Sequence, residues 1–136
     1  MKTKQGFTLI ELLVVIAIIG ILVSVGIASF LTAQKQARDA KRAQTMLDIQ
    51  SAFEQYQGAY GSYPVSPSLT DAFDDKTLPL DPKNSGNYVI DWSHTATDSY
   101  CICAKLESHT GNADAPSSTA CNWDTTKDYF CVENKQ

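Results

Sequence analysis

Length, composition and charge already restrict what this chain can be. It has 136 residues, which leaves room for one small globular domain once a long apolar segment is set aside. The formal net charge is −4, but residues 59–136 hold eleven acidic side chains against five lysines and no arginine, a local charge of −6. Such a region lacks the basic patch that grips phosphates, so we expect it to bind no nucleic acid.

The N-terminus combines a short basic stretch with a long apolar one. Residues 1–6 are polar and include Lys2 and Lys4, whereas residues 7–31 contain one ionisable side chain, that of Glu11. As a helix, residues 7–31 would reach roughly 37 Å, enough to cross a hydrocarbon core of about 30 Å. The pattern therefore predicts a segment that spans or inserts into a membrane.

The order of these features differs from that of a secretory signal peptide. A signal peptide has an apolar core of roughly 7 to 15 residues, followed by a small residue at the cleavage site. Here the apolar run is longer, and the small residue, Gly6, precedes it. Basic residues flank the span on both sides and leave its orientation open. Disulfides need an oxidising compartment, so the cysteines beyond the span favour an external C-terminal domain.

Glu11 is the unusual residue of the apolar segment. A carboxylate at mid-bilayer costs about 2.5 to 3.5 kcal/mol. One explanation is structural: the side chain reaches the membrane interface, or it stabilises the start of the helix through the helix dipole. The other explanation is that the carboxylate has a functional partner.

Residues 6–22, GFTLIELLVVIAIIGIL, closely resemble the N-terminal motif of type IV pilins and pseudopilins. The resemblance implies that a prepilin peptidase cuts between Gly6 and Phe7 on the cytoplasmic side and that Phe7 becomes an N-methylated mature N-terminus. It also implies that the Glu11 carboxylate meets the charged amine of Phe7 on a neighbouring subunit. Such a partner would offset much of the cost of burying the acid and would select the axial register of the subunits.

The same resemblance implies a structural role. We expect a subunit of a type IV pilus: a homo-oligomeric helical filament, extracellular once assembled. Before assembly the chain would be a single-pass protein of the inner membrane, surrounded by lipid and served by the prepilin peptidase and the inner-membrane assembly machinery. The alternatives are a pseudopilin of a type II secretion or DNA-uptake system and a membrane-anchored binding module that never assembles. We expect neither enzymatic activity nor a cofactor.

The helix is expected to continue beyond the membrane segment. No Pro or Gly occurs between residue 31 and Gly58, so we predict one helix over about residues 7–57 that stops at Gly58. One face carries an apolar stripe that should pack on the head: Met46, Ile49, Phe53, Tyr56 and Tyr60. Pilins often have a Pro in the apolar half, where the helix loosens. This chain has only Gly20 and Gly26 there, so whether its helix melts stays open.

Charged residues of the second half of the helix allow two interpretations. Arg38, Lys41 and Arg42 lie among Asp39 and Asp48. The favoured prediction is a solvated face with local ion pairs. The alternative is contact with the acidic heads of neighbouring subunits.

Residues 59–136 should form a small head domain. Turn residues dominate residues 59–87, with a helical turn expected over residues 69–73. Strands are predicted over residues 88–92, 99–106 and 129–132. The predicted fold is therefore α+β and pilin-like, with a leader (1–6), a membrane-spanning helix (7–31), an amphipathic helix (32–58) and a head (59–136) whose antiparallel sheet of about three strands packs on the helix.

The four cysteines of the head are interpreted as two disulfides. Cys101 and Cys103 are two residues apart, so on a strand both thiols point to the same face and do not bond each other without strain. Two pairings remain: Cys101 with Cys121 and Cys103 with Cys131, or Cys101 with Cys131 and Cys103 with Cys121.

Metal binding and catalysis receive little support from the sequence. A zinc site could combine the four cysteines with His94 or His109, but the usual C-x₂₋₄-C spacing does not occur. Calcium could bind loop acids such as Asp81, Asp91 and Asp98, as some pseudopilin relatives suggest, although solvated acids are the simpler interpretation. Neither histidine belongs to a nucleophile motif, so both are predicted to lie on the surface.

Overall fold

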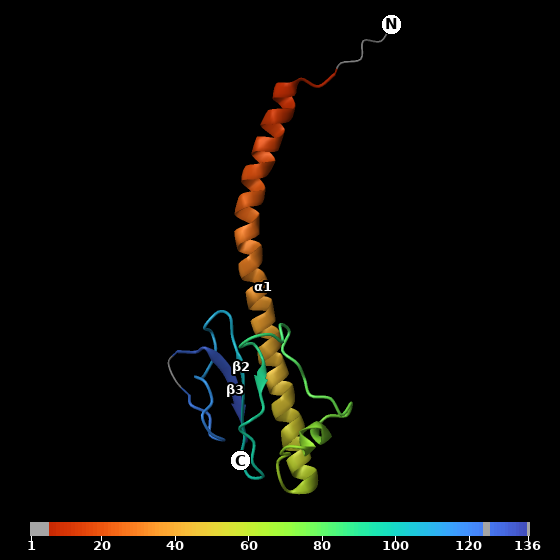
Figure 1. The fold of residues 1–136 in the computed structure, drawn as a ribbon, viewed down its shortest axis with the longest axis vertical. Helices are drawn as coiled ribbons and strands as arrows, with labels where there is room; N and C mark the ends of the chain where they lie inside the picture. Colours follow the sequence, from red (N-terminus) through yellow and green to blue (C-terminus); the bar gives the residue numbers. More distant parts are fainter. Residues whose placement is uncertain (1–5, 124–125, 136) are drawn as a thin grey trace. The chain divides into compact units, whose positions relative to one another are not determined.

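The computed structural model describes residues 6–123 and 126–135. It contains one long α-helix, α1 (Leu9–Tyr60), a short 3₁₀ helix, η1 (Ser68–Ala72), and three strands, β1 (Ile90–Asp91), β2 (Cys101–Lys105) and β3 (Tyr129–Glu133) (Figure 1). The predicted α+β class is confirmed. The chain divides into two compact units, one ending at Gln34 and the other beginning at Lys35, and each is described by itself. Of the predicted leader, residues 1–5 lie outside the described residues.

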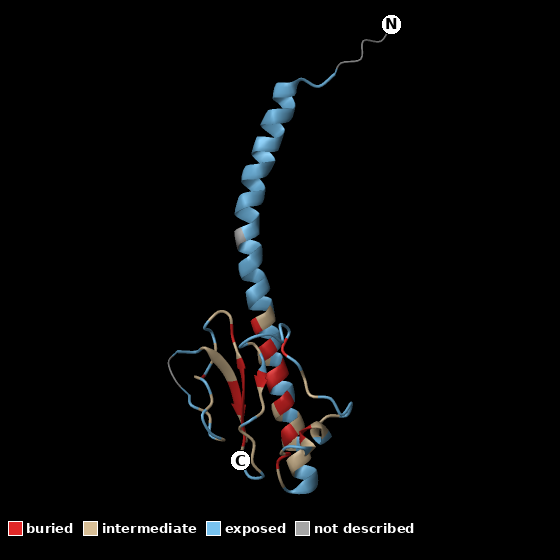
Figure 2. Ribbon diagram, in the orientation of Figure 1, coloured by how far each residue is buried: buried red, intermediate tan, exposed pale blue. Residues whose placement is uncertain are grey.

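The first unit holds the apolar half of α1. Gly20 and Gly26 both lie within the helix, which is unbroken between Leu9 and Tyr60. The described apolar side chains of this half are exposed all round, from Phe7 (89% exposed) to Leu31 (53%) (Figure 2). By length and composition, α1 contains a stretch able to cross a membrane.

The end of α1 differs from the prediction. The helix continues through Gly58 and ends at Tyr60. The following residue, Gly61, has a φ of +75° and donates its N–H to the Gln57 carbonyl at 2.7 Å. This left-handed conformation closes a helix end and favours glycine. Gly61 is therefore the helix stop, because only the second of the two glycines adopts that conformation.

The second unit is built around a three-stranded antiparallel sheet in the order β1-β2-β3. Cys103 lies opposite Asp91 on one side and opposite Cys131 on the other. The predicted strand over residues 88–92 is reduced to Ile90–Asp91. The reason is a turn just before it, in which the Tyr88 N–H bonds to the Ser85 carbonyl and Gly86 has a positive φ.

The core of the second unit lies between α1 and the sheet (Figure 2). Met46, Ile49 and Phe53 are fully buried, as their spacing predicted. They pack with side chains from one face of the sheet and with Tyr63 and Leu69: Ile90, Tyr100, Ile102, Ala104 and Val132.

The apolar stripe of α1 is shorter than predicted. Tyr60 is 70% exposed and stacks on Tyr56, with ring centroids 4.4 Å apart, instead of entering the core. Gly58, Ala59 and Tyr60, the last three residues of α1, are all exposed.

Both faces of β2 are covered. Tyr100, Ile102 and Ala104 face the helix side of the core, and Cys101 and Cys103 belong to a second buried cluster with Cys131. Ala113, which forms an isolated bridge with Tyr129 at the start of β3, belongs to the same cluster and is fully buried. A small head thus obtains two layers of buried side chains from one strand.

Candidate assembly site

The predicted processing junction lies at the start of α1. Gly6 and Phe7 precede the helix and are exposed. Thr8 occupies the position just before the first helical residue, and Glu11 lies three residues later, in the first turn. Six consecutive residues, 6–11, therefore hold the predicted cleavage bond, the predicted methylated amine and the predicted assembly carboxylate.

Thr8 and Glu11 bond to each other. The Thr8 backbone N–H donates to Glu11 Oε2 at 2.9 Å, and the Thr8 hydroxyl donates to the same oxygen at 2.8 Å. In return, the Glu11 N–H donates to Thr8 Oγ1 at 3.3 Å. This is a capping box, in which the side chains at both ends of the first turn satisfy backbone N–H groups that have no helical partner.

The capping box adds a local role to Glu11 that the sequence interpretation overlooked. Its signal, Thr8 followed by Glu three residues later, is visible in the sequence. The carboxylate of a single subunit is thus held close to the helix start, with one oxygen, Oε2, bonded to Thr8. A positively charged partner of Glu11 would meet a carboxylate that its bonds to Thr8 already orient.

The surroundings of Glu11 are apolar on every side of the helix. A helix that is apolar all round is stable inside a bilayer or among other apolar helices, and not in water. The described apolar side chains of residues 7–31 are exposed within their own unit. This half of α1 can therefore insert into lipid or pack against copies of itself.

A buried ionic cluster joins α1 to two segments of the head. Arg42, only 1% exposed, bonds through Nε and Nη2 to the two carboxylate oxygens of Asp81, at 2.6 and 2.9 Å. Its Nη1 reaches Asp39 at 2.7 Å and Glu107 at 2.9 Å. Arg38 forms a second bidentate pair with Glu107, at 2.7 and 2.8 Å. We call these five residues the arginine cluster.

The arginine cluster contradicts the predicted solvated face at Asp39 and Arg42, which are buried. Lys41 and Asp48 are exposed as predicted, and Asp39 and Arg42 form a local ion pair. Arg42 pairs with acids 39 and 65 residues away in the sequence, and Asp39 accepts the backbone N–H of Glu107 at 3.0 Å. The alternative, contact with the acidic heads of neighbouring subunits, is not supported either, because Arg38 and Arg42 already pair with Glu107 and Asp81 of the same chain. The helix and the head are thus held together by charge as well as by apolar packing.

The cluster also changes the acidity of its members. Hydrogen bonds from Arg38 are the main cause that lowers the pKa of Glu107 to about 2. Burial is the largest influence on Asp81 and raises its pKa. The hydrogen bonds and charge of Arg42, together with the backbone N–H groups of Lys83 and Asn84, outweigh burial, so the pKa of Asp81 lies below its ordinary value. Both acids are therefore charged at neutral pH.

The structure pairs Cys101 with Cys121 and Cys103 with Cys131, one of the two pairings left open by the sequence. Cys101 and Cys103 point to the same face of β2, with sulfur atoms 3.6 Å apart. The first disulfide holds the loop after β2, and the second joins β2 to β3. The two stack together in the buried cluster behind the sheet.

The residues considered as metal ligands have other partners. All four cysteine sulfurs lie within 4.8 Å of one another, but each belongs to a disulfide. Asp81 is buried against Arg42 and is not a solvated loop acid. His109 is exposed, as predicted, and contacts Asp128, whereas His94 is half-buried beside Asp91.

Comparison with known proteins agrees with these features. The family model "Prokaryotic N-terminal methylation motif" matches residues 1–27. The type IV wide pilus major component PilA4 of Thermus thermophilus is 35% identical over 104 residues, which cover 76% of this chain and 75% of the relative.

Type II secretion system core protein G of Vibrio cholerae and that of Aeromonas hydrophila are each 29% identical over 91 residues. Both matches cover 65% of this chain, and 62% and 64% of the respective relatives, so the chain spans less than two thirds of their length. No solved structure matches significantly. On the strength of the pilus relative and the N-terminal motif, the chain belongs to the family of type IV pilins and type II secretion pseudopilins.

Proposed function

We propose that this chain is the prepilin of a type IV pilus, a surface filament whose subunits are held together by their apolar helices. Membership of the family makes it a structural subunit of a pilus or a pseudopilus, and its named relatives are components of filaments and secretion systems. The leader (1–6) is removed between Gly6 and Phe7, and Phe7 is then N-methylated. Residues 7–31 form the filament core, residues 32–58 carry the head, and residues 59–136 form the disulfide-stabilised head outside.

The observation that carries the proposal is the position of Glu11. It lies four residues after Phe7, in the half of α1 whose described apolar side chains are exposed all round. A membrane anchor needs neither a carboxylate at this depth nor a small residue before its apolar run. A filament core needs both, because cleavage creates a charged amine and the amine offsets the cost of burying the acid.

Two steps precede assembly in this proposal. The subunit waits as a single-pass protein in the inner membrane, surrounded by lipid, until the prepilin peptidase removes the leader. The inner-membrane assembly machinery then adds it to the filament, where contact with neighbouring helices replaces contact with lipid. The finished filament is extracellular.

A pilus is preferred over a pseudopilus on the basis of similarity. The wide-pilus relative has the higher identity and is covered over three quarters of its length, whereas the secretion-system relatives are covered over less than two thirds. A pseudopilin of a type II secretion or DNA-uptake system remains the second candidate, because its short filament would use the same helix and the same carboxylate.

The first experiment analyses material sheared from the cell surface by mass spectrometry. We expect long filaments that contain this chain, starting at an N-methylated Phe7. An intact Met1 confined to the membrane fraction would contradict the proposal, and a Phe7 start without surface filaments would favour the pseudopilin.

The second experiment separates the charge of Glu11 from its role in the capping box. Glu11→Gln keeps an oxygen able to accept the Thr8 N–H but removes the negative charge. Thr8→Ala keeps the negative charge of Glu11 but removes the Thr8 hydroxyl that bonds to Glu11 in the capping box. We expect Glu11→Gln to abolish filaments while membrane insertion persists, and Thr8→Ala to retain most filaments. Normal filaments from Glu11→Gln would refute the proposed pairing with the amine.

A further inference from the structure

One face of α1 in the second unit is polar and uncovered. Its residues are spaced 3, 4, 3 and 4 apart, so they form a single stripe, and all are exposed: Lys41, Gln44, Asp48, Ser51 and Gln55. The stripe that packs on the head runs along a different side of the helix, through Arg42, Met46, Ile49 and Phe53. We call the first set the polar stripe.

The charges of the polar stripe are separated along the helix. Lys41 lies at one end, and among the described residues its ammonium has no ion-pair partner, in contrast to its neighbour Arg42 in the arginine cluster. Asp48 lies seven residues later and accepts one hydrogen bond, from Gln44 at 2.8 Å. The same face of the helix therefore presents the Lys41 ammonium, which has no ion-pair partner among the described residues, and the Asp48 carboxylate, which accepts a single hydrogen bond.

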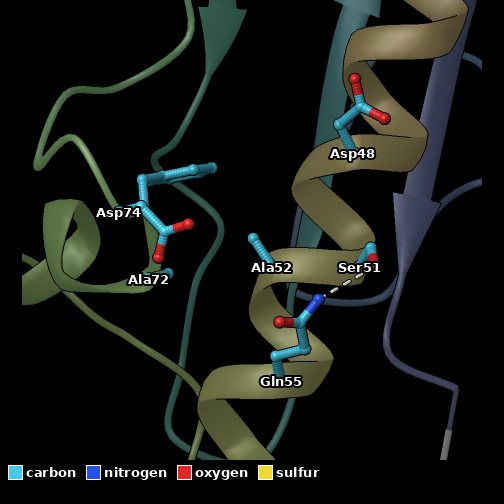
Figure 3. A pocket seen from close by; sticks show the side chains of 7 residues that line it. Asp48, Ser51, Ala52, Gln55, Ala72 and Asp74 are labelled. Atoms are coloured by element: carbon cyan, nitrogen blue, oxygen red, sulfur yellow. Dashed lines mark hydrogen bonds between the residues drawn. The ribbon is translucent and has the colours of Figure 1, made fainter.

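Asp48 belongs to an open pocket between α1 and the segment after η1 (Figure 3). The pocket has a volume of about 260 Å³ and is lined by Asp48, Ser51, Ala52, Gln55, Ala72, Phe73 and Asp74. Asp74 lies across the pocket from the helix (Figure 3), and within the described part of the chain its carboxylate has no partner. Two carboxylates thus border a hollow that contains no cation of this subunit.

We propose that the pocket receives Lys41 of a second copy of this chain. This inference rests on the proposed filament and names one of its contacts. A lysine has a long, flexible stem and a compact charge, which suits a small open pocket with acids on two sides. The two partners are the complementary charges that the polar stripe leaves unpaired.

The geometry of this contact favours a filament over a closed dimer. Lys41 and the pocket are different parts of the surface, so the contact is heterologous: each copy offers its lysine to one neighbour and its pocket to another. Heterologous contacts that do not close into a ring generate open helical assemblies. For copies with parallel helices, the seven residues between Lys41 and Asp48 correspond to an axial displacement of about 10 Å.

The contact is tested first by crosslinking in filaments. Cells that carry unlabelled and ¹⁵N-labelled subunits in the same filament are treated with a carbodiimide, which joins a lysine to a carboxylate without a spacer. We expect crosslinked peptides that join Lys41 of one isotope to Asp48 or Asp74 of the other. Intact filaments without such peptides would overturn the inference.

Charge reversal provides the second test. We expect Lys41→Asp and Asp48→Lys each to lower the yield of sheared filaments at least tenfold, and the double variant to restore it to within threefold of the wild type. Lys35→Asp, an equal change at another exposed lysine of α1 outside the stripe, is the matched control and should stay within threefold. Normal yields from the single variants, a double variant without recovery, or an equal loss from the control would each overturn the contact.

These outcomes are distinguishable from a failure of the proposed function. Wild-type filaments with a methylated Phe7 support the function whatever the charge variants do. If the wild-type chain forms no filaments, the proposed function fails and the contact fails with it.

Discussion

Replacement of Arg42 by Met should destabilise the head strongly. The substitution keeps most of the volume and removes the charge that Asp39, Asp81 and Glu107 share. Loss of one partner of a buried ion pair costs about 3 to 5 kcal/mol, because the remaining charge stays buried without compensation. Here Glu107 keeps Arg38, but Asp81 loses both of its bonds to the cluster. The free energy of unfolding of a small domain is only about 5 to 15 kcal/mol, so this loss should be easy to measure.

Trp92 offers a direct probe of this unfolding. Its ring lies 6.3 Å from those of Phe53 and Phe73, so its fluorescence reports on the core. We would place Trp123→Phe in every variant, since the chain has two tryptophans and Trp123 is exposed. The full chain is unfolded with urea in detergent, with its disulfides intact. Lys41→Met, the same change of charge one residue earlier on the exposed face, is the control and should shift stability by less than about 0.5 kcal/mol.

The pH dependence of the difference gives a second check. The pKa of Glu107 is lowered to about 2 and that of Asp81 is also lowered, so the stability that they contribute is present above their ordinary values and is lost as the pH falls towards 2. In Arg42→Met the acids that have lost Arg42 destabilise the head less once they are protonated, because no unpaired charge then stays buried. The difference in the free energy of unfolding between the wild type and Arg42→Met should therefore be larger at pH 7 than at pH 3. A difference below about 1 kcal/mol, or one independent of pH, would refute the reasoning.

Three further predictions concern the backbone and the disulfides. Gly61→Ala should cost about 1 kcal/mol, because its φ is +75°, whereas Gly58→Ala should stabilise by up to about 1 kcal/mol, because Gly58 is helical; urea unfolding of the pair would show opposite signs. Gly111→Ala should cost about 1 to 3 kcal/mol in the same assay, since its Cβ would lie 1.9 Å from the Tyr129 carbonyl oxygen. Cys103→Ser with Cys131→Ser should lower the free energy of unfolding by about 3 to 4 kcal/mol, given the 28-residue separation of the two cysteines, and a change below about 1 kcal/mol would contradict this.

Local patterns in the sequence sufficed for the features that depend on near neighbours. The apolar run and the stripe of Met46, Ile49 and Phe53 follow from helical periodicity, and the same-face placement of Cys101 and Cys103 follows from the two-residue repeat of a strand. The family also follows from a local pattern, the motif around Gly6 and Glu11. Even the capping box was readable, because its two residues are three apart.

The features that the sequence left open or misjudged depend on distant residues or on a single backbone conformation. Gly58 and Gly61 are chemically identical, and only the φ reached at the second one decides where α1 ends. The pairing of the cysteines depends on the register of β2 and β3, which places Cys103 opposite Cys131.

The charges near residue 40 show the same division most clearly. Arg42 and Lys41 are adjacent basic residues in one helix, and the sequence offers no reason to treat them differently. Tertiary structure separates them, because the rotation of about 100° between neighbours turns Arg42 towards Asp81 and Glu107 and leaves Lys41 outside. The sequence by itself determined an apolar helix with an acid near its start. The packing of the head on that helix decided which charges hold the subunit together and which stay exposed.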